Sequence, residues 1–331
     1  VGNNDVIFNP GESFFYTCDV SGVTAATFAD GANDAQVNAN VRTDGSDIDH
    51  EDGSEVVIVV PSIELLKDNT ENTDDTQVVV DGGVASFKIT VTNNGTANLD
   101  TLIITDAEAP NCSQSVLQTQ ALVAGVGNND TIFNPGESFF YECTATEVDA
   151  NTFLDGYNEA RVDATVTVDS STISDEDTTM VEIVDPGITI LKDDSTPNDP
   201  DTDGEDSQTV VNGANAEFTI IVTNSGTADL NTVIITDAET DDCEKDSIQT
   251  GVLIAGVGNN DTVFNIGESF AYSCTASGVS TNTFLDGDND ASVTALVVAD
   301  GTMLGSQDAT TVIVEAPSIV IDKNDNDDSN N

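Results

Sequence analysis

The sequence predicts an all-β protein built from tandem β-sandwich repeats of about 125–131 residues. The first observation is a recurrence, because residues 126–137 (VGNNDTIFNPGE) reappear with small changes at 1–12 and 257–268. The second is that short runs in which Val, Ile, Thr and Phe alternate with polar residues fill the stretches between, as half-buried strands do. The third is that clusters of Gly, Asn and Asp separate these runs, which indicates turns.

The chain is strongly acidic. Its 331 residues include 61 Asp and Glu against 7 Lys and Arg, which gives a formal net charge of -54. We expect no nucleic acid partner, because phosphate contacts need Lys and Arg, and no attraction to an anionic membrane. No apolar run approaches the roughly 20 residues that span a bilayer, so direct membrane insertion is not expected. Because 38% of the residues are hydrophobic and fall in strand-like runs, we expect a folded chain rather than a disordered one.

The repeats keep one phase along the whole chain. Equivalent cysteines mark one repeat position in three copies, at Cys18, Cys143 and Cys274. Equivalent lysines mark another, at Lys67, Lys192 and Lys323. We expect complete repeats at 61–185 and 186–316, the C-terminal half of a repeat at 1–60, and the first strand and acidic loop of the next at 317–331. This phase favours a window cut from a longer repetitive chain. The alternative is strand exchange between subunits, although the unit so completed would be about 50 residues short.

One repeat, 61–185, shows the expected elements. The predicted strands are 62–67, 85–92, 99–105, 118–124, 138–145, 159–168 and 179–184, with an acidic loop at 68–76 and no helix. Seven short strands with turns at this spacing are typical of an immunoglobulin-like sandwich.

The cysteines predict one disulfide per repeat. Cys112 and Cys143 are separated by the same number of residues as Cys243 and Cys274, and free buried thiols are the alternative. Cys18 is left over. Disulfides imply an oxidising, extracellular compartment. Four triplets also fit the N-glycosylation pattern, and their asparagines are Asn94, Asn111, Asn129 and Asn260.

Residues 87–106 (FKITVTNNGTANLDTLIITD) recur closely at 218–237, and a Leu-Leu-Lys-Asp strand precedes them at 65–68. Together with the Asn-x-Asp…Pro-Gly-Glu segment at 126–137, these strings resemble the conserved-repeat immunoglobulin-like domains of prokaryotic cell-surface and extracellular fibre proteins. The resemblance covers nearly the whole chain. It implies a surface location and a role as a stalk, an adhesin, or a component of a fibre or sheath.

The acidic loops predict calcium sites. With Val126 as position 1 of a twelve-residue loop, oxygen-bearing side chains fall at positions 3, 5, 9 and 12, which is the ligand spacing of an EF-hand. Position 1 lacks Asp and position 6 lacks Gly, and the alternative is Asx turns that bond their own backbone. An inserted loop at 199–206 has Asp at positions 1, 3 and 5 and Gly at 6, and a plain solvated loop is its alternative. The candidate ligands are Asn3, Asp5, Asn9, Glu12, Asn128, Asp130, Asn134, Glu137, Asp199, Asp201, Asp203, Asp206, Asn259, Asp261, Asn265 and Glu268.

Bound Ca2+ would offset the repulsion among so many carboxylates. The competing explanation is the generally acidic surface of a halophile's proteins, and the regular placement of the loops favours specific sites.

The repeated lysine position predicts a partly buried ion pair at Lys67 and its copies. The alternative is an intramolecular isopeptide bond to an Asn or Asp, as in some surface pilins. The only histidine, His50, has no histidine counterpart in the other repeats and is expected at the surface. No repeated histidine is available for a catalytic triad or a metalloenzyme centre, so we do not expect an enzyme.

The sequence therefore predicts a structural extracellular protein, a calcium-stiffened and disulfide-containing repeat array that forms a filament or a surface stalk. The expected partners are further copies of the chain or the continuation of a longer repeat chain. The alternative is an adhesin module that binds a glycan or a host protein through its loops.

Overall fold

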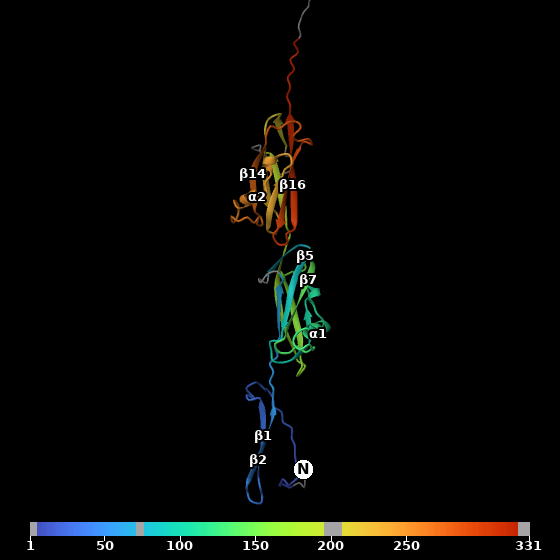
Figure 1. Ribbon diagram of the computed structural model, residues 1–331, viewed down its shortest axis with the longest axis vertical. Helices are drawn as coiled ribbons and strands as arrows, with labels where there is room; N and C mark the ends of the chain where they lie inside the picture. The colour runs from blue at the N-terminus through green and yellow to red at the C-terminus, as the bar shows by residue number, and fades with distance from the viewer. Residues whose placement is uncertain (1–4, 71–75, 195–206, 324–331) are drawn as a thin grey trace, which may run out of the picture.

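The computed structural model describes residues 5–70, 76–194 and 207–323. Figure 1 shows a hairpin, two sandwiches and a final extended segment that follow one another along the long axis of the molecule. Within these residues no helix is both long enough and apolar enough to cross a membrane.

The first sandwich consists of two facing sheets. The three-stranded sheet has the order β3 (Glu64–Asn69), β5 (Gly83–Thr92), β7 (Ser138–Val148) and is antiparallel throughout. The four-stranded sheet has the order β4 (Thr76–Val80), β9 (Thr172–Val184), β8 (Tyr157–Val166), β6 (Leu99–Thr105), with β4 parallel to β9.

The second sandwich repeats this topology strand for strand. One sheet has the order β10 (Ile188–Asp194), β12 (Ala216–Asn224), β14 (Ser269–Ala276). The other has the order β11 (Ser207–Val211), β16 (Met303–Glu315), β15 (Asp288–Val297), β13 (Leu230–Thr236). The prediction of an all-β fold with tandem immunoglobulin-like sandwiches is confirmed.

The cores lie between the sheets and follow from the alternation in the sequence. In β5, the side chains of Phe87, Ile89 and Val91 are fully buried while the residues between them face outward. Successive side chains of a strand point to opposite faces, so every second residue enters the core. Phe133, within the acidic loop at 126–137, is fully buried as well and pairs with Leu99 at the start of β6.

Residues 5–60 form a hairpin of β1 (Ala32–Asn40) and β2 (Asp47–Glu55) preceded by an extended segment. Their side chains are almost all exposed, including Phe8, Phe15 and Tyr16. The equivalent residues of the complete repeats are strands of a closed sandwich. In the described part of the chain no second sheet covers this hairpin.

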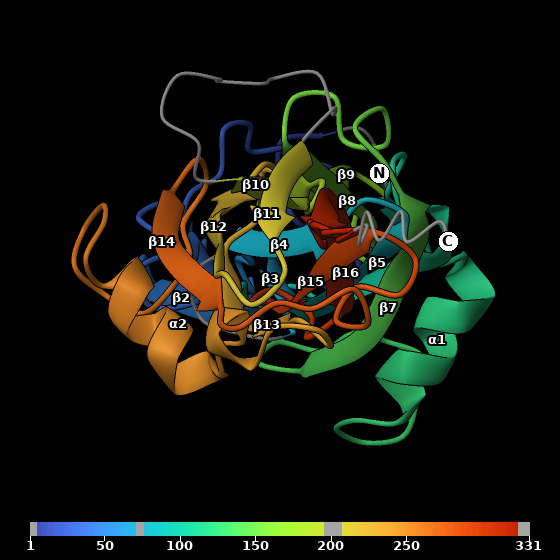
Figure 2. The ribbon, with the colours of Figure 1, turned by 90° about the horizontal axis from the view of Figure 1, so that it is seen from above.

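The prediction of no helix is wrong at one place in each repeat. Residues 118–124, predicted as a strand, belong to α1 (Val116–Ala124), and α2 (Ser247–Ile254) is its copy. The cause is local, because the backbone N–H of Ser115 donates to Gln118 Oε1 at 2.8 Å in a capping box. Looking down the long axis, Figure 2 shows α1 and α2 on different sides, so the second sandwich is rotated about this axis relative to the first.

Candidate functional site

The loop at 126–137 is closed by its own side chains. Asn128 Oδ1 accepts the backbone N–H of Asp130 at 3.1 Å, and Asp130 Oδ1 accepts that of Ile132 at 2.8 Å. Glu137 Oε2 accepts the N–H of Asn134 at 2.8 Å, and Asn134 Nδ2 donates to the carbonyl of Ile132 at 3.0 Å. These are Asx-type turns, in which side-chain oxygens satisfy nearby backbone donors.

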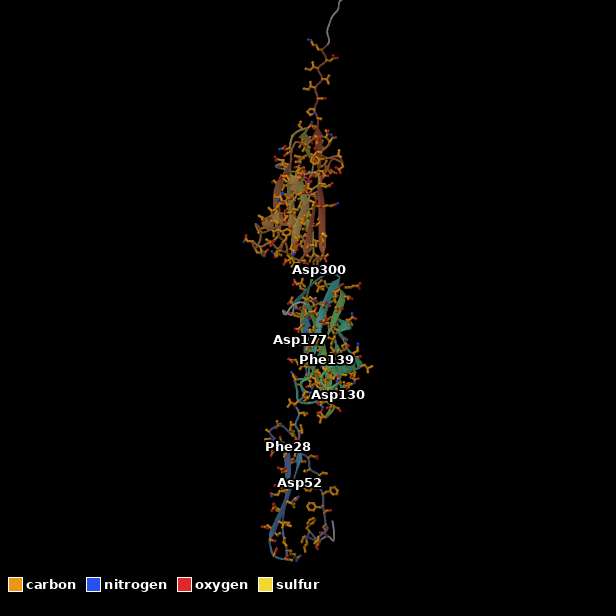
Figure 3. The ribbon with its side chains drawn as sticks, in the orientation of Figure 1. Phe28, Asp52, Asp130, Phe139, Asp177 and Asp300 are labelled. Carbon is orange, nitrogen blue, oxygen red and sulfur yellow. A yellow bond between two sulfur atoms is a disulfide. The ribbon has the colours of Figure 1, made fainter. Side chains whose placement is uncertain are left out.

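The same loop needs glycine at its second position. Gly127 has φ +59°, and a Cβ added there would lie 1.6 Å from Glu137 Oε1. The loop is also fixed to the neighbouring turn, since Asn93 Nδ2 donates to the carbonyl of Phe133 at 2.7 Å. The loop therefore belongs to the end of the sandwich nearer the hairpin, where Figure 3 labels Asp130.

The other copies are built alike where the structure describes them. In the third copy, Asp261 Oδ1 accepts the N–H of Val263 at 2.8 Å and Glu268 Oε2 that of Asn265 at 2.9 Å; Asn259 Oδ1 accepts the N–H of Asp261 at 3.0 Å. In the first copy, Asp5 Oδ1 and Glu12 Oε2 accept the N–H groups of Ile7 and Asn9, both at 2.8 Å. Asn3 and the inserted-loop candidates Asp199, Asp201, Asp203 and Asp206 lie outside the described residues.

The expected calcium ligands are partly engaged by these turns. Calcium takes about six to eight oxygen ligands, whereas each loop offers two carboxylates whose bonded oxygens already accept N–H groups. No cluster of three or more His, Cys, Asp or Glu that could hold a metal is found among the described residues. The sequence also makes the turn at Asp155 a candidate source of extra ligands. Asp155, however, lies near the far end of β6, a strand of 7 residues or about 20 Å. Calcium at these loops stays a prediction.

Both predicted disulfides are present. Cys112–Cys143 and Cys243–Cys274 each join Cα atoms 5.1 Å apart. Each connects the short helix that follows an edge strand of one sheet, η1 (Pro110–Cys112) or η2 (Asp241–Cys243), to an edge strand of the other sheet, β7 or β14. The bond therefore ties the two sheets of a sandwich together. Cys18 is free and exposed.

A tyrosine supports each disulfide. The hydroxyl of Tyr141 donates to the carbonyl of Cys112 at 2.5 Å, and Tyr272 does the same to Cys243. Burial raises the pKa of both tyrosines, and the nearby Asp106 and Asp237 raise it further. The hydroxyls therefore stay protonated and act as donors.

The repeated lysines are more deeply buried than predicted. The side chain of Lys67 is fully buried, its Nζ lies 2.5 Å from Asp106 Oδ2, and the Phe87 ring centroid is 4.6 Å away. Lys192 forms the same ion pair with Asp237, also fully buried, 4.6 Å from the Phe218 ring. The predicted ion pair is thus present in each complete repeat, inside the core rather than at its edge.

The environment of these lysines favours the uncharged amine. Burial lowers the pKa of Lys67 and of Lys192, and the paired carboxylate opposes this. Burial likewise raises the pKa of Asp237, against the influence of Lys192. In both repeats the second carboxylate oxygen accepts a backbone N–H, from Ala109 at 2.7 Å and from Thr240 at 2.9 Å.

Two asparagines near these pairs were not predicted to be buried. Asn158 and Asn289 are fully buried and lie at equivalent positions of β8 and β15. Asn33 occupies this position in the first repeat, so the recurrence was visible in the sequence. The sequence places them in the turn segment of Asp155 and its copy, a candidate source of extra calcium ligands, and only burial sets the two asparagines apart.

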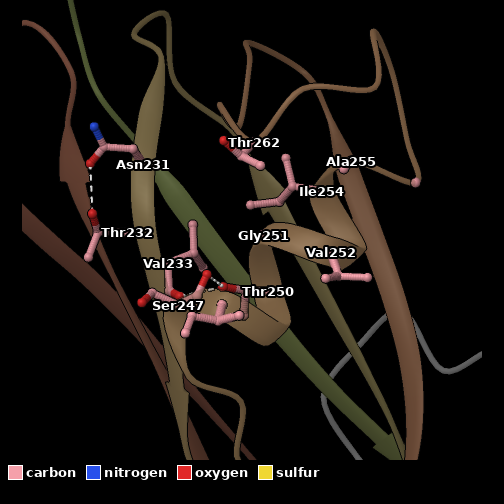
Figure 4. Close-up of a pocket in the computed structure, with 12 residues that line it drawn as sticks. Asn231, Thr232, Val233, Ser247, Thr250, Gly251, Val252, Ile254, Ala255 and Thr262 are labelled. Carbon is pink, nitrogen blue, oxygen red and sulfur yellow. Dashed lines mark hydrogen bonds between the residues drawn. The ribbon is translucent and has the colours of Figure 1, made fainter.

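A hollow of about 730 Å³ lies beside α2 in the second sandwich. Figure 4 shows Val233, Thr250 and Ile254 among its lining residues, with no charged side chain in the set. Thr250 Oγ1 donates to the carbonyl of Val233 at 2.5 Å and so anchors the helix to a bulge in β13. The lining offers apolar contacts and hydroxyls, and no acid or base.

No protein-family model matches the sequence, and no curated protein matches it either. Among solved structures the chain is similar to Rst D1-D2, with a TM-score of 0.28 and 11% identity over 75% of this chain and 99% of that one. It is also similar to the Ig1-Ig3 ectodomain of mouse nectin-like molecule 4, with a TM-score of 0.27 and 14% identity over 81% of this chain and 69% of that one. Dpr2 Ig1-Ig2, solved in complex with DIP-Theta Ig1-Ig3, gives a TM-score of 0.22 and 8% identity over 76% and 99% of the two chains. Similarities of this size say nothing about function, so function has to be inferred from the residues of this chain.

Proposed function

We propose that this chain is part of an extracellular structural protein whose sandwiches follow one another as a stiff rod, in a filament or a surface stalk. The observation that supports this most directly is the junction between the two sandwiches. β9 ends at Val184 and β10 begins at Ile188, so only residues 185–187 connect them. A linker this short gives the sandwiches little freedom to reorient.

The linker is also clamped to a turn of the sandwich that follows. The N–H of Asp185 donates to Thr227 Oγ1 at 2.7 Å, and the N–H of Thr227 donates to the carbonyl of Asp185 at 2.8 Å. The junction before the first sandwich repeats this pair of bonds between Val60 and Thr96, at 2.8 and 2.9 Å. A clamp that recurs at successive junctions is a property of the repeat.

Glycine in the clamping turn lets the linker pass. A Cβ added at Gly226 would lie 2.1 Å from the Gly187 nitrogen and 2.6 Å from the Asp185 carbonyl oxygen. Gly95 stands in the same relation to Val60, whose carbonyl oxygen would be 2.7 Å from the added Cβ. The turn and the linker therefore touch along their backbones.

Apolar side chains close the junction. Val184, the last residue of β9, belongs to the core of the second sandwich, and Val80 of the first packs against that core. A hollow of only about 170 Å³ remains there, lined from one side by Val78 and from the other by Ile266 and Val298. Contacts of this kind resist bending at the junction.

An extracellular location is supported by the two disulfides, which persist in oxidising compartments. The net charge of -54 fits a surface that faces water on all sides and repels other acidic surfaces. We propose a structural role rather than an enzymatic one.

Spin labels test the stiffness of the junction. On a Cys18→Ser background, cysteines replace Leu117 and Ile248, equivalent exposed residues of α1 and α2. Double electron–electron resonance should give one narrow distribution of distances between the two labels. Thr227→Val, which removes the side-chain bonds of the clamp, should broaden it. Thr96→Val alters only the preceding junction and is the matched control. A distance distribution that is already broad without Thr227→Val would contradict the rod.

Calcium binding at the acidic loops is a further part of the proposal. Because the turns already use one oxygen of Asp130 and one of Glu137, an ion would take the remaining oxygens and complete its shell with water. We therefore expect weak sites, in the roughly millimolar range of extracellular modules. Calcium at about ten times Kd would then stabilise a sandwich by about 1.4 kcal/mol per loop.

Thermal melts in calcium and in chelator measure this directly. Asp130→Asn keeps the acceptor for Ile132 N–H while removing the charge, so it should abolish the response of the first sandwich and leave that of the second. Equal melting temperatures with and without calcium would remove the ion from the proposal.

The second candidate function is an adhesin module that binds a glycan or a host protein. The observation in its favour is the hollow beside α2, where Ile248 and Val252 are strongly exposed. A glycan array probed with the purified chain, and again with Val252→Asp, decides it: binding that this variant abolishes would support the adhesin.

A further inference from the structure

The first sandwich buries an asparagine amide without a partner. Asn158 on β8 is fully buried, and neither Nδ2 nor Oδ1 has a hydrogen-bond partner. In the second sandwich Asn289 Oδ1 is likewise unpartnered. A buried polar group left unbonded costs about 1–3 kcal/mol, so a recurrent one calls for an explanation.

The backbone brings Lys67 next to this asparagine. The N–H of Lys67 donates to Asp177 Oδ2 at 2.8 Å, and its carbonyl accepts the hydroxyl of Thr179 at 2.7 Å. Both partners are on β9, the strand that Figure 3 marks at Asp177. Thr179 is directly opposite Asn158 in the β8–β9 register. Lys67 and Asn158 are therefore both neighbours of Thr179.

Asp106 approaches the same place from the other side of β8. It follows β6, whose last residue Thr105 is paired with Arg161. Extending that register by one places Asp106 opposite Ala160, which shares the buried face of β8 with Asn158. Asp106, the ion-pair partner of Lys67, therefore lies beside the buried face of β8 that carries Asn158.

The second sandwich shows the connection bond by bond. Lys192 Nζ pairs with Asp237 Oδ2, and Asp237 Oδ1 accepts the N–H of Thr240 at 2.9 Å. Thr240 Oγ1 in turn accepts Asn289 Nδ2 at 3.0 Å. The hydroxyl of Thr310, opposite Asn289 in the register, donates to the carbonyl of Lys192 at 2.7 Å. In the first sandwich Ala109 replaces Thr240 and provides no hydroxyl, which explains why Asn158 Nδ2 has no partner.

We propose that each complete repeat forms an intramolecular isopeptide bond, between Lys67 Nζ and Asn158 Cγ in the first sandwich and between Lys192 Nζ and Asn289 Cγ in the second. Asp106 and Asp237 are the catalytic residues, because each touches the attacking nitrogen. The inference goes beyond the proposed stiff rod, which does not need a covalent cross-link.

The reaction needs no co-reactant. The ammonium passes a proton to the carboxylate, which yields a neutral amine and a carboxylic acid. The amine attacks Cγ of the asparagine, and the acid donates its proton to the amide. The new C–N bond forms and the old C–Nδ2 bond breaks. The proton that the attacking nitrogen loses leaves with the ammonia as ammonium, and the aspartate regains its charge. Burial lowers the pKa of both lysines and raises that of Asp237, which favours the neutral pair that this step requires.

A bond at this place would join the two sheets along the path of a pulling force. Lys67 is on β3, the first strand of the sandwich, and Asn158 is on β8, the neighbour of the last strand β9. Tension applied to a chain of sandwiches enters at the first strand and leaves at the last. The cross-link would carry that load and keep the sandwich from opening.

Mass spectrometry of the reduced, denatured full chain tests the proposal. The mass should be lower than the sequence mass by two ammonia molecules, and digestion should yield branched peptides that join Lys67 to Asn158 and Lys192 to Asn289. Lys67→Arg should restore one ammonia, with the second sandwich as the internal control. Asp106→Ala should likewise prevent the loss of one ammonia, although both reacting side chains remain.

Each outcome has a distinct meaning. A chain of full mass would overturn the proposal and leave only buried ion pairs. Loss of water instead of ammonia would also overturn it, since the lysine would then be joined to the aspartate. Ammonia loss that persists in Lys67→Arg would come from cyclisation at another asparagine, and would count against a bond at this lysine. None of these results depends on the rod, whose stiffness the spin labels measure separately.

Discussion

Replacing Asp106 by alanine is expected to lower the free energy of unfolding of the first sandwich by about 3–5 kcal/mol. Lys67 is fully buried, and besides this carboxylate its Nζ faces the Phe87 ring, whose centroid is 4.6 Å away. Removing the carboxylate leaves a buried ammonium that has to lose its proton or expose itself to water. Urea denaturation, with hydrogen exchange to locate the loss in the first sandwich, measures the change.

An exposed ion pair of the same sandwich is the matched control. Arg161 and Asp163 are 2.9 Å apart with side chains 44% and 43% exposed. Asp163→Ala should therefore change the free energy of unfolding by about 1 kcal/mol or less. If Asp106→Ala lowers the free energy of unfolding no more than this control does, the buried pair stabilises the sandwich no more than an exposed pair.

The double substitution Lys67→Met with Asp106→Leu separates charge from covalent bonding. Buried ion pairs replaced by apolar residues of similar size are often neutral or stabilising. An ion pair alone therefore predicts a double variant about as stable as the original chain. A cross-link predicts that the double variant stays several kcal/mol below it, because both single and double substitutions remove the bond.

Local alternation of apolar and polar residues carried most of the fold prediction. The strand at 99–105 has the predicted bounds, and the pairing of Cys112 with Cys143 followed from spacing alone. β4 was missed, because its short apolar run is paired in parallel with β9, a strand about a hundred residues later. Parallel pairing across such a separation leaves no local pattern in the sequence.

α1 was missed for a different reason. Its apolar residues do not form one clear stripe, since Leu117 is 79% exposed while Val123 is buried. The signal that was present is the capping box, a Ser at 115 with Gln three residues later. A contact with β6 also holds the helix in place: the hydroxyl of the buried Thr119 donates to the carbonyl of Leu102 at 2.7 Å. The apolar pattern of the helix does not reveal this contact.

The candidate sites show where spacing stops being informative. Oxygen side chains at alternate positions, such as Asn128 and Asp130, suit calcium ligands and Asx turns equally well, because both bring an oxygen back toward the loop. Burial of Asn158 depends in part on β6, which is separated from β8 in the chain by η1, α1 and β7. The repeat shows that the position recurs, and only the folded chain shows the lysine beside it.

Removing the disulfide of the first sandwich, by Cys112→Ala with Cys143→Ala, is expected to lower its free energy of unfolding by about 3–4 kcal/mol. The bond closes a loop of 31 residues, and the loss of that constraint raises the entropy of the unfolded chain. Calorimetry should show the melting transition of one sandwich moving while that of the other stays. Cys18→Ala, at an exposed free thiol, is the control and should have an effect within about 0.5 kcal/mol.

The size of this loss also depends on the proposed Lys67–Asn158 bond. That bond would close a longer loop that contains both Cys112 and Cys143, so the unfolded chain would be constrained already before the disulfide is removed. Chain-entropy cost grows only with the logarithm of loop length, and a disulfide inside an existing loop removes less additional freedom. The disulfide should therefore contribute more in the Lys67→Arg variant than in the original chain. Equal contributions in the two chains would mean that the two constraints do not share a loop, in disagreement with the cross-link.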